Sequence, residues 1–235
     1  MSGAKIATAI STTDFQQCWI KVDGRTSSSF SGVTFLHYKA EASHSMLLVM
    51  HVAFLSVCTQ KGIPLTRWGI GLTVLLEKIV GNNFVHKLRA ICLLEADFNW
   101  INKVVFAKRM IRSALERNLI PGKCFSKKGS NCINAIMTKI FICIESRIHH
   151  HDACIAGNNF GDCYDWAAHP IAAISLRSLG VPQPAINVLL ETMETMRFYL
   201  RTGFGESKTS YGGTHEERLA GYGQALRLQV QVSQP

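Results

Sequence analysis

Residues 97–117 constrain the fold most, because this segment combines helical periodicity with clustered positive charge. Apolar residues recur along it at helical spacing, and basic residues occupy the positions between them. Asp97 is the expected N-terminal cap, and Asn118 and Pro121 predict the end. We therefore expect one long amphipathic helix. Its apolar positions are Phe98, Ile101, Val105 and Met110, and its basic positions are Lys103, Lys108, Arg109, Arg112 and Arg117.

Apolar runs predict further helices on both sides of this one. The longest run, residues 46–58, is too short to cross the hydrocarbon core of a bilayer, so we expect a buried helix. Ser43 or Ser45 is its expected N-cap, and Gly62 marks its end. Residues 70–80 are also expected to be helical. Later helices are expected from Ser130 and over residues 167–179 and 183–200, the last two separated by Gly180-Val181-Pro182.

Together these patterns predict a mostly helical α+β fold. Residues 152–160 are short and bounded by turn residues, which allows one strand. No internal repeat is present, and the Ser-rich stretch within the first 43 residues predicts a loop-rich N-terminal extension. The helix from Ser130 is expected to bury one side, formed by Ile133, Ile136, Met137, Ile140 and Ile144.

Cysteine usage and hydropathy indicate an intracellular protein, nuclear or cytoplasmic, without a membrane partner. The eight cysteines occur singly, with none of the short CxxC spacings of a zinc site or redox pair. Cys58, Cys92 and Cys143 lie on apolar helical faces and are expected to fill the core.

Positive charge is concentrated in one fifth of the chain. Residues 78–128 contain eleven Lys and Arg against three acids, a balance of +8 out of a total net charge of +9. Such a concentration is typical of a phosphate-binding surface. The alternative interpretation is a solvated helix face.

Short motifs inside this basic region occur in a characteristic order. Lys87-Leu88-Arg89-Ala90-Ile91 is followed by Asn102-Lys103 and Lys108-Arg109-Met110, and then by residues 125–130. The order and spacing resemble the fingers of reverse transcriptases of non-LTR retroelements and group II introns. The resemblance implies that basic side chains bind the incoming nucleotide and the template backbone. The matching residues are Lys87, Arg89, Lys103, Arg109, Lys127 and Lys128.

Residues 158–165, Asn-Asn-Phe-Gly-Asp-Cys-Tyr-Asp, resemble polymerase motif A. In the family an aspartate of this motif helps to hold the Mg²⁺ ions of nucleotidyl transfer, and the matching position here is Asn159, whose neutral amide is a poor ligand for a hard cation. Tyr164 matches the aromatic residue that excludes a ribose 2′-hydroxyl, and Asp165 matches the second, supporting acid. Trp166 departs from the usual arginine. Without the fingers motifs, a polar turn would be the preferred interpretation.

The resemblance extends over roughly residues 31–224 and implies reverse-transcriptase fingers plus an incomplete palm. It ends at Gly221-Tyr222-Gly223-Gln224, where Gly223 and Gln224 match the start of the family's Gly-Gln-Gly motif, which contacts template and nucleotide, and Ala225 replaces the next glycine. No match to the second aspartate motif or to the thumb follows. The implied regions are an extension at 1–43, fingers at 44–150, a partial palm at 151–224 and an unrelated tail at 225–235.

These features predict a truncated reverse-transcriptase-like (RNA-directed DNA polymerase) domain that binds RNA or an RNA/DNA hybrid and deoxynucleotides but is catalytically inactive. The alternative is a non-catalytic helical nucleic-acid-binding protein. A third possibility is a product that folds poorly and aggregates. The run His149-His150-His151-Asp152 suggests a metal site, but consecutive side chains diverge, so a solvent-exposed turn is preferred there.

Overall fold

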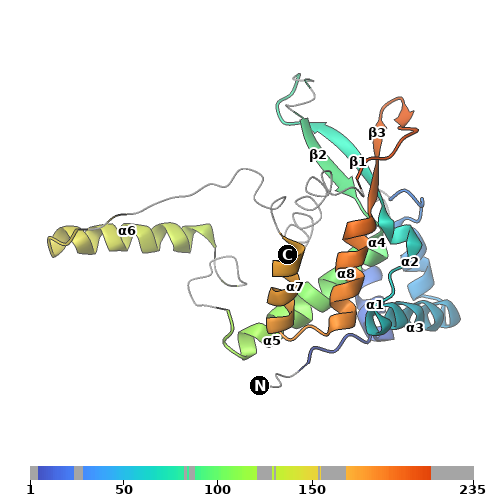
Figure 1. The fold of residues 1–235 in the computed structure, drawn as a ribbon, viewed down its shortest axis with the longest axis horizontal. Coiled ribbons are helices and arrows are strands. Elements are labelled where there is room, and N and C mark those ends of the chain that lie inside the picture. The colour runs from blue at the N-terminus through green and yellow to red at the C-terminus, as the bar shows by residue number, and fades with distance from the viewer. Residues whose placement is uncertain are drawn as a thin grey trace. The chain divides into compact units, whose positions relative to one another are not determined.

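The structure, a computed structural model, describes residues 5–23, 29–81, 84, 88–120, 129, 131–152, 154 and 168–212. The chain forms two compact units. The first comprises residues 1–113 and 162–235, and the second comprises residues 114–161. The fold is α+β, as predicted, and the first unit contains the sheet (Figure 1).

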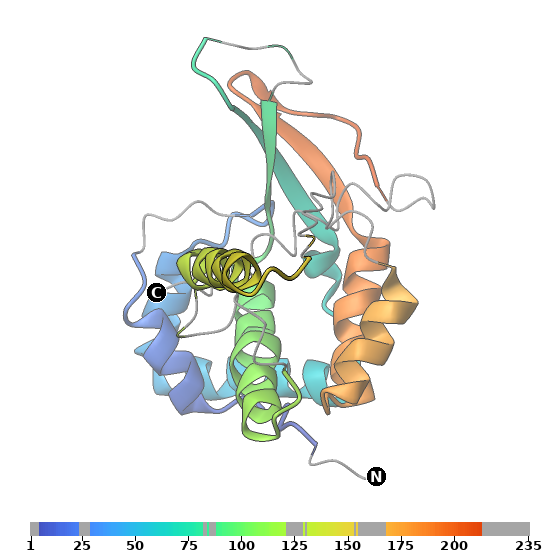
Figure 2. The same cartoon turned by 90° about the vertical axis from the view of Figure 1, so that its left-hand side faces the viewer.

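A four-stranded mixed sheet forms one part of the first unit, with strand order β2-β1-β3-β4. β1 pairs antiparallel with β2 and parallel with β3, while β3 pairs antiparallel with β4. Figures 1 and 2 show β1, β2 and β3 extending away from the helices of this unit, with α8 leading into β3. The strands are β1 (Ile70–Glu77), β2 (Leu88–Leu93), β3 (Arg197–Thr202) and β4 (Gly205–Glu206).

The helix predicted over residues 70–80 is wrong, because this segment contains the central strand β1. Its middle residues are buried, and it has a hydrogen-bonded neighbour on each side. A strand covered in this way has an almost continuous apolar run, which periodicity cannot distinguish from a buried helix. The helix predicted over residues 183–200 is wrong at its end for a similar reason, since Met196 is extended and β3 begins at Arg197.

Helices of the first unit carry their own start signals. Ser11 and Asp14 form a reciprocal capping box at the start of α1, so the first 43 residues are less loop-rich than predicted. His44 caps α3, in place of the predicted Ser43 or Ser45, by accepting a hydrogen bond from the Leu47 amide. The helices are α1 (Thr12–Trp19), α2 (Phe35–Ala42), α3 (Ser45–Lys61), the short 3₁₀ turn η1 (Thr66–Gly69), α7 (His169–Ser178) and α8 (Gln183–Thr195).

The predicted central helix is present, in three successive segments. These are α4 (Ala96–Asn102), a π-helical segment η3 (Lys103–Met110) and α5 (Ile111–Glu116). Glu95 occupies the N-cap position instead of Asp97, which lies buried in the first turn. Asn118 has a φ of 53° just beyond the end, as its predicted role as a stop residue requires.

An aromatic core joins α1, α2 and α4. Trp19 stacks on Tyr38 with ring centroids 4.6 Å apart, and Phe15 contacts Trp100 edge-on at 5.3 Å. All four rings are almost fully buried. Large buried rings of this kind dominate the energetics of a small core.

The described part of the second unit is mainly α6 (Cys132–Ile148), whose N-cap Asn131 accepts a hydrogen bond from the Asn134 amide. The burial predicted for this helix is wrong, because the apolar residues expected to face a core are exposed. Cys143 is exposed as well, whereas Cys58 and Cys92 are buried as predicted. The strand allowed over residues 152–160 lies mostly outside the described residues. The residues of α6 that were predicted to be buried but are exposed are Ile133, Ile136, Met137, Ile140 and Ile144.

Within the described residues, no single helix is both long and apolar enough to cross a membrane. α2 and α3 pass that test only as a pair, and they are bent by 115° at the break between them.

Candidate nucleic-acid interface

Strand register places three arginines on one face of the sheet. Arg89 of β2 is opposite Leu76 of β1, while Arg197 and Arg201 of β3 are opposite Ile70 and Val74. Residues 70, 74 and 76 of β1 are separated by even numbers of positions, so their side chains project from the same side of the strand. Paired residues share a face. We call this side, with Arg89, Arg197, Tyr199 and Arg201, the arginine face.

The arginine face also contains an aromatic pair and one acid. The ring of Phe30 stacks on Tyr199 at 4.8 Å between centroids, and Phe30 is itself exposed. Arg201 donates from Nε to Glu206 at 3.0 Å and forms an ion pair with it. Arg89 and Arg197 are exposed, and no described residue forms an ion pair with either. A surface with cations beside an aromatic ring is suited to phosphates and bases.

The opposite face of the sheet is packed, as is the part of the arginine face around the fully buried Leu72, which pairs with Tyr199. Gly71 lies against Phe198, and a Cβ at that position would be 2.6 Å from the nearest ring carbon. Tyr211 pairs with Phe198 through both backbone hydrogen bonds, and its hydroxyl contacts Thr73. Burial raises the pKa of Tyr211. The arginine face therefore has a closely packed backing.

Arg89 and Lys103, which the fingers resemblance assigns to one binding platform, lie on different elements. Arg89 is in β2, and Lys103 follows the last residue of α4. The intervening chain spans roughly 13 Å of strand and roughly 10 Å of helix. Figure 1 shows β2 and α4 running in different directions from their junction. The structure thus does not bring these two cations together.

Arg109, another residue assigned to template binding, has intramolecular partners. Its guanidinium donates to the carbonyl oxygens of Ala7 and Ala9 at 2.7 and 2.8 Å, and it pairs with Asp14 at 2.8 Å. These bonds hold the N-terminal segment against η3.

Burial raises the pKa of the Cys18 thiol, and the positive charges of Lys103 and Lys108 oppose this effect only in part.

The remaining predicted site residues lie outside the described residues: Lys87, Lys127, Lys128, Asn159, Tyr164, Asp165 and Gln224. In the part of the chain that the structure describes, no three His, Cys, Asp or Glu side chains gather in a way that would hold a metal ion. The implied Mg²⁺ site therefore rests on motif A alone, where the amide of Asn159 does not fit a hard cation.

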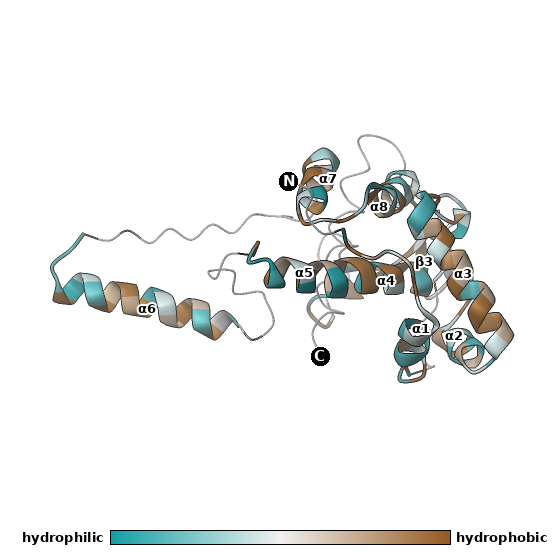
Figure 3. Ribbon diagram, turned by 90° about the horizontal axis from the view of Figure 1, so that it is seen from below, coloured by the Kyte–Doolittle hydropathy of each residue, from teal (hydrophilic) through white to brown (hydrophobic). Residues whose placement is uncertain are grey.

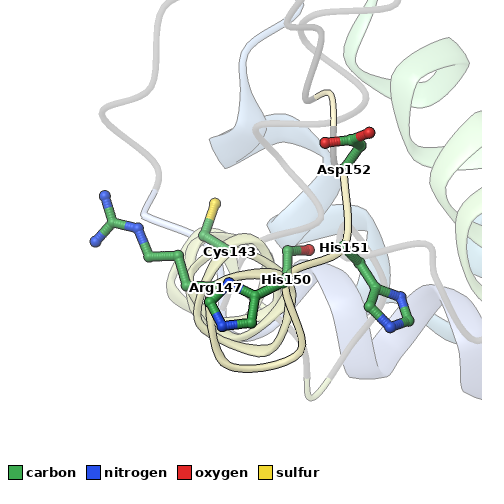
Figure 4. Close-up of a pocket in the computed structure, with 6 residues that line it drawn as sticks. Cys143, Arg147, His150, His151 and Asp152 are labelled. Carbon is green, nitrogen blue, oxygen red and sulfur yellow. The ribbon is translucent and has the colours of Figure 1, made fainter.

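The histidine run lines a hollow in the second unit. The hollow has a volume of about 540 Å³ and is bordered by Cys143, Ser146, Arg147, His150, His151 and Asp152. Figure 4 shows these side chains pointing in different directions, with His151 and Arg147 on opposite sides of the helix end. His149 and His150 lie in a turn, and all four residues of the run His149-His150-His151-Asp152 are exposed, as predicted.

A buried carboxylate cluster, which the sequence patterns do not indicate, sits at the junction of sheet and helices. Glu95 and Asp97 are both fully buried, and Arg67 forms ion pairs with both. Trp68 donates from Nε1 to Asp97 at 3.0 Å. The hydroxyls of Ser29 and Ser31 donate to Glu95. Arg67, Trp68 and two serine hydroxyls thus satisfy both buried carboxylates, which indicates a structural role for the cluster.

Arg197 and Arg201 were also missed by the sequence patterns, because the helix predicted over residues 183–200 includes Arg197 and stops just before Arg201. Residues four positions apart share a side in both a helix and a strand, so the spacing of Arg197 and Arg201 alone does not reveal the strand. No protein-family model matches the chain, and no curated protein sequence is significantly similar to it.

Proposed function

We propose that the chain contains a reverse-transcriptase-like domain that binds an RNA or RNA/DNA template and deoxynucleotides and does not catalyse nucleotidyl transfer. The fingers motifs and motif A support the ancestry. The arginine face is the observation that carries the binding function.

Three guanidinium groups on one sheet face suit a phosphate backbone. Arg89 and Arg201 lie on strands two steps apart, hence roughly 10 Å across the sheet. One nucleic-acid strand can contact both, while the ring of Phe30, stacked on Tyr199, offers an exposed surface for a base. The packed opposite face keeps these groups in place without a bound ligand.

Motif A supports the loss of catalysis. When bound, Mg²⁺ stabilises the attacking and leaving oxygens of phosphoryl transfer. Asn159 replaces a charged ligand by a neutral amide, so the residues of this chain do not supply the expected donor set.

RNA binding as a function of salt concentration tests the proposal. Arg89→Gln, Arg197→Gln and Arg201→Gln are each expected to weaken binding several-fold and to lower the salt dependence by about one released ion. Arg177→Gln removes an equal charge from α7, where Arg177 is exposed and bonds to Gln183, and is the matched control. If RNA affinity and its salt dependence are the same in the three sheet variants as in the unchanged chain, the arginine face is not the binding surface.

A non-catalytic nucleic-acid-binding protein without polymerase function remains the second candidate. The hydrogen bonds of Arg109 to Ala7, Ala9 and Asp14 favour this second candidate. They mean that one residue of the fingers motif stabilises the fold instead of contacting the template. Deoxynucleotides separate the two candidates. A fingers surface is expected to bind template more tightly when deoxynucleoside triphosphate is present, whereas a simple RNA-binding surface shows competition or no effect.

A further inference from the structure

α3 has an exposed apolar stripe along one side. Its large members expose between 51% and 66% of their surface. Figure 3 shows α3 as hydrophobic over much of its length. From Ser45 to Gln60 the helix contains no Asp, Glu, Lys or Arg. We define the α3 stripe as Met46, Val49, Met50, Ala53, Phe54 and Val57, all of them exposed.

The fold does not need this side of α3. Leu48, Val52, Leu55 and Cys58 already anchor the other side in the core of the first unit. Exposed apolar patches of this size mark interaction sites more often than chance. The stripe is therefore available for a partner.

The spacing of the stripe is symmetric about a point between His51 and Val52. If two copies of α3 cross antiparallel at that point, Met46 of one copy faces Val57 of the other, and Met50 faces Ala53. Val49 faces Phe54 in the same way. Large side chains thus meet small or medium ones, and the same six residues complete both halves, as a two-fold interface requires. The 4-3-4 spacing of residues 46, 50, 53 and 57 is also that of an interhelical seam.

The available area is consistent with a reversible dimer. The stripe exposes on the order of 600 Å² per copy, which places two copies near the lower limit for specific interfaces. The absence of formal charge removes the desolvation cost that a charged helix face would add. We propose that α3 mediates an antiparallel, two-fold dimer of this chain, with Met50 of each copy packed against Ala53 of the other. This inference is independent of nucleic-acid binding.

Molar mass measured across a range of concentrations, by sedimentation or light scattering on the full chain, tests the dimer. The unchanged chain is expected to shift from monomer to dimer with rising concentration. Met50→Glu and Ala53→Lys are each expected to abolish the dimer, because each places a charge against an apolar residue. The combined variant Met50→Glu/Ala53→Lys is expected to restore it, because the register brings the two new charges together across the interface.

Val80→Glu is the control, since Val80 is 96% exposed and lies outside α3, and it is expected to leave the mass unchanged. Circular dichroism confirms that each variant is folded. A monomer at all concentrations overturns the proposal, as does a dimer that survives both single substitutions. Species larger than a dimer, or a monomer that binds phosphatidylcholine vesicles through the stripe, overturn it in favour of aggregation or a lipid surface.

Discussion

Arg67 and Asp97 form an ion pair in which the carboxylate is fully buried and the guanidinium remains about one-third exposed. Arg67 also pairs with the buried Glu95, at 3.1 Å. Glu95 and Asp97 begin α4 immediately after β2, and Arg67 lies in η1 immediately before β1. One guanidinium therefore holds the root of the β1–β2 hairpin to the start of the helix that leads to Lys103.

Replacing Arg67 by methionine is expected to destabilise the protein by about 3 kcal/mol, because two buried carboxylates lose their cation. The partial exposure of the guanidinium places the effect at the lower end of the range for buried pairs. Urea unfolding measures it. Arg201→Met breaks the exposed pair with Glu206 and is expected to cost less than about 1 kcal/mol. Equal effects of the two substitutions would contradict the structural role of the cluster.

His51 links two helices through carboxylates on both sides of its ring. Nδ1 lies 2.7 Å from Glu41 of α2, and Nε2 lies 3.7 Å from Asp97 of α4, beyond hydrogen-bond distance. Burial of the imidazole lowers its pKa, but the carboxylates of Asp97 and Glu41 outweigh this effect, and the pKa of His51 is raised. Protonated His51 therefore stabilises the folded state.

The stabilising contribution of His51 is expected to be complete below the pKa of an unfolded histidine, about 6.5, and to disappear as the pH rises through the raised folded value. Urea unfolding of the unchanged chain and of His51→Gln at a series of pH values measures it. The difference in unfolding free energy should shrink as the pH increases. A difference that grows with pH would mean that His51 is neutral when folded.

Arg109 is expected to serve the fold rather than the template. Arg109→Lys keeps the charge but loses the planar fork that reaches the carbonyls of Ala7 and Ala9, so residues 5–11 should exchange amide hydrogens faster. The free energy of unfolding should fall by about 1–2 kcal/mol. RNA affinity should stay within error of the unchanged chain. A loss of affinity as large as that caused by Arg89→Gln would instead support the role that the fingers motif predicts.

Features specified by local chemistry were predictable from the sequence. The central helix, the end of α3 at Gly62 and the break at Gly180-Val181-Pro182 depend on neighbouring residues, and the structure confirms them. β1 and β3 depend on each other, since Leu72 is a strand residue only when Leu93 and Tyr199 pair with it. Such non-local pairing leaves no distinctive mark on a short apolar segment.

The candidate site shows the same division. A short sequence motif is enough to propose Arg89 as a binding residue. Arg197 and Arg201 lie on the same sheet face only because of the register between β3 and β1. Arg67 meets Glu95 and Asp97 across 28 and 30 residues of chain, and no spacing rule connects them. The isoleucines of α6 show a further limit of sequence-based prediction. Helical periodicity identifies an apolar side of a helix but does not show whether that side is buried.

Gly71 tests whether the packed side of the sheet supports the arginine face. In Gly71→Ala the new Cβ would lie 2.6 and 2.7 Å from two carbons of the Phe198 ring, so the ring must move away from β1. We expect a loss of about 1–3 kcal/mol in unfolding free energy, the usual cost of overpacking. RNA binding should weaken as well, because Phe198 lies between Arg197 and Tyr199 on β3.

Gly69→Ala is the matched control for this substitution. Its Cβ would meet Thr195 Oγ1 at 3.6 Å, an ordinary contact, so stability and RNA affinity should hardly change. If Gly71→Ala destabilises the protein while RNA affinity per folded molecule stays constant, the position of β3 does not matter for binding. The interface must then be sought on η3, where Lys103 and Lys108 follow each other along one helical segment.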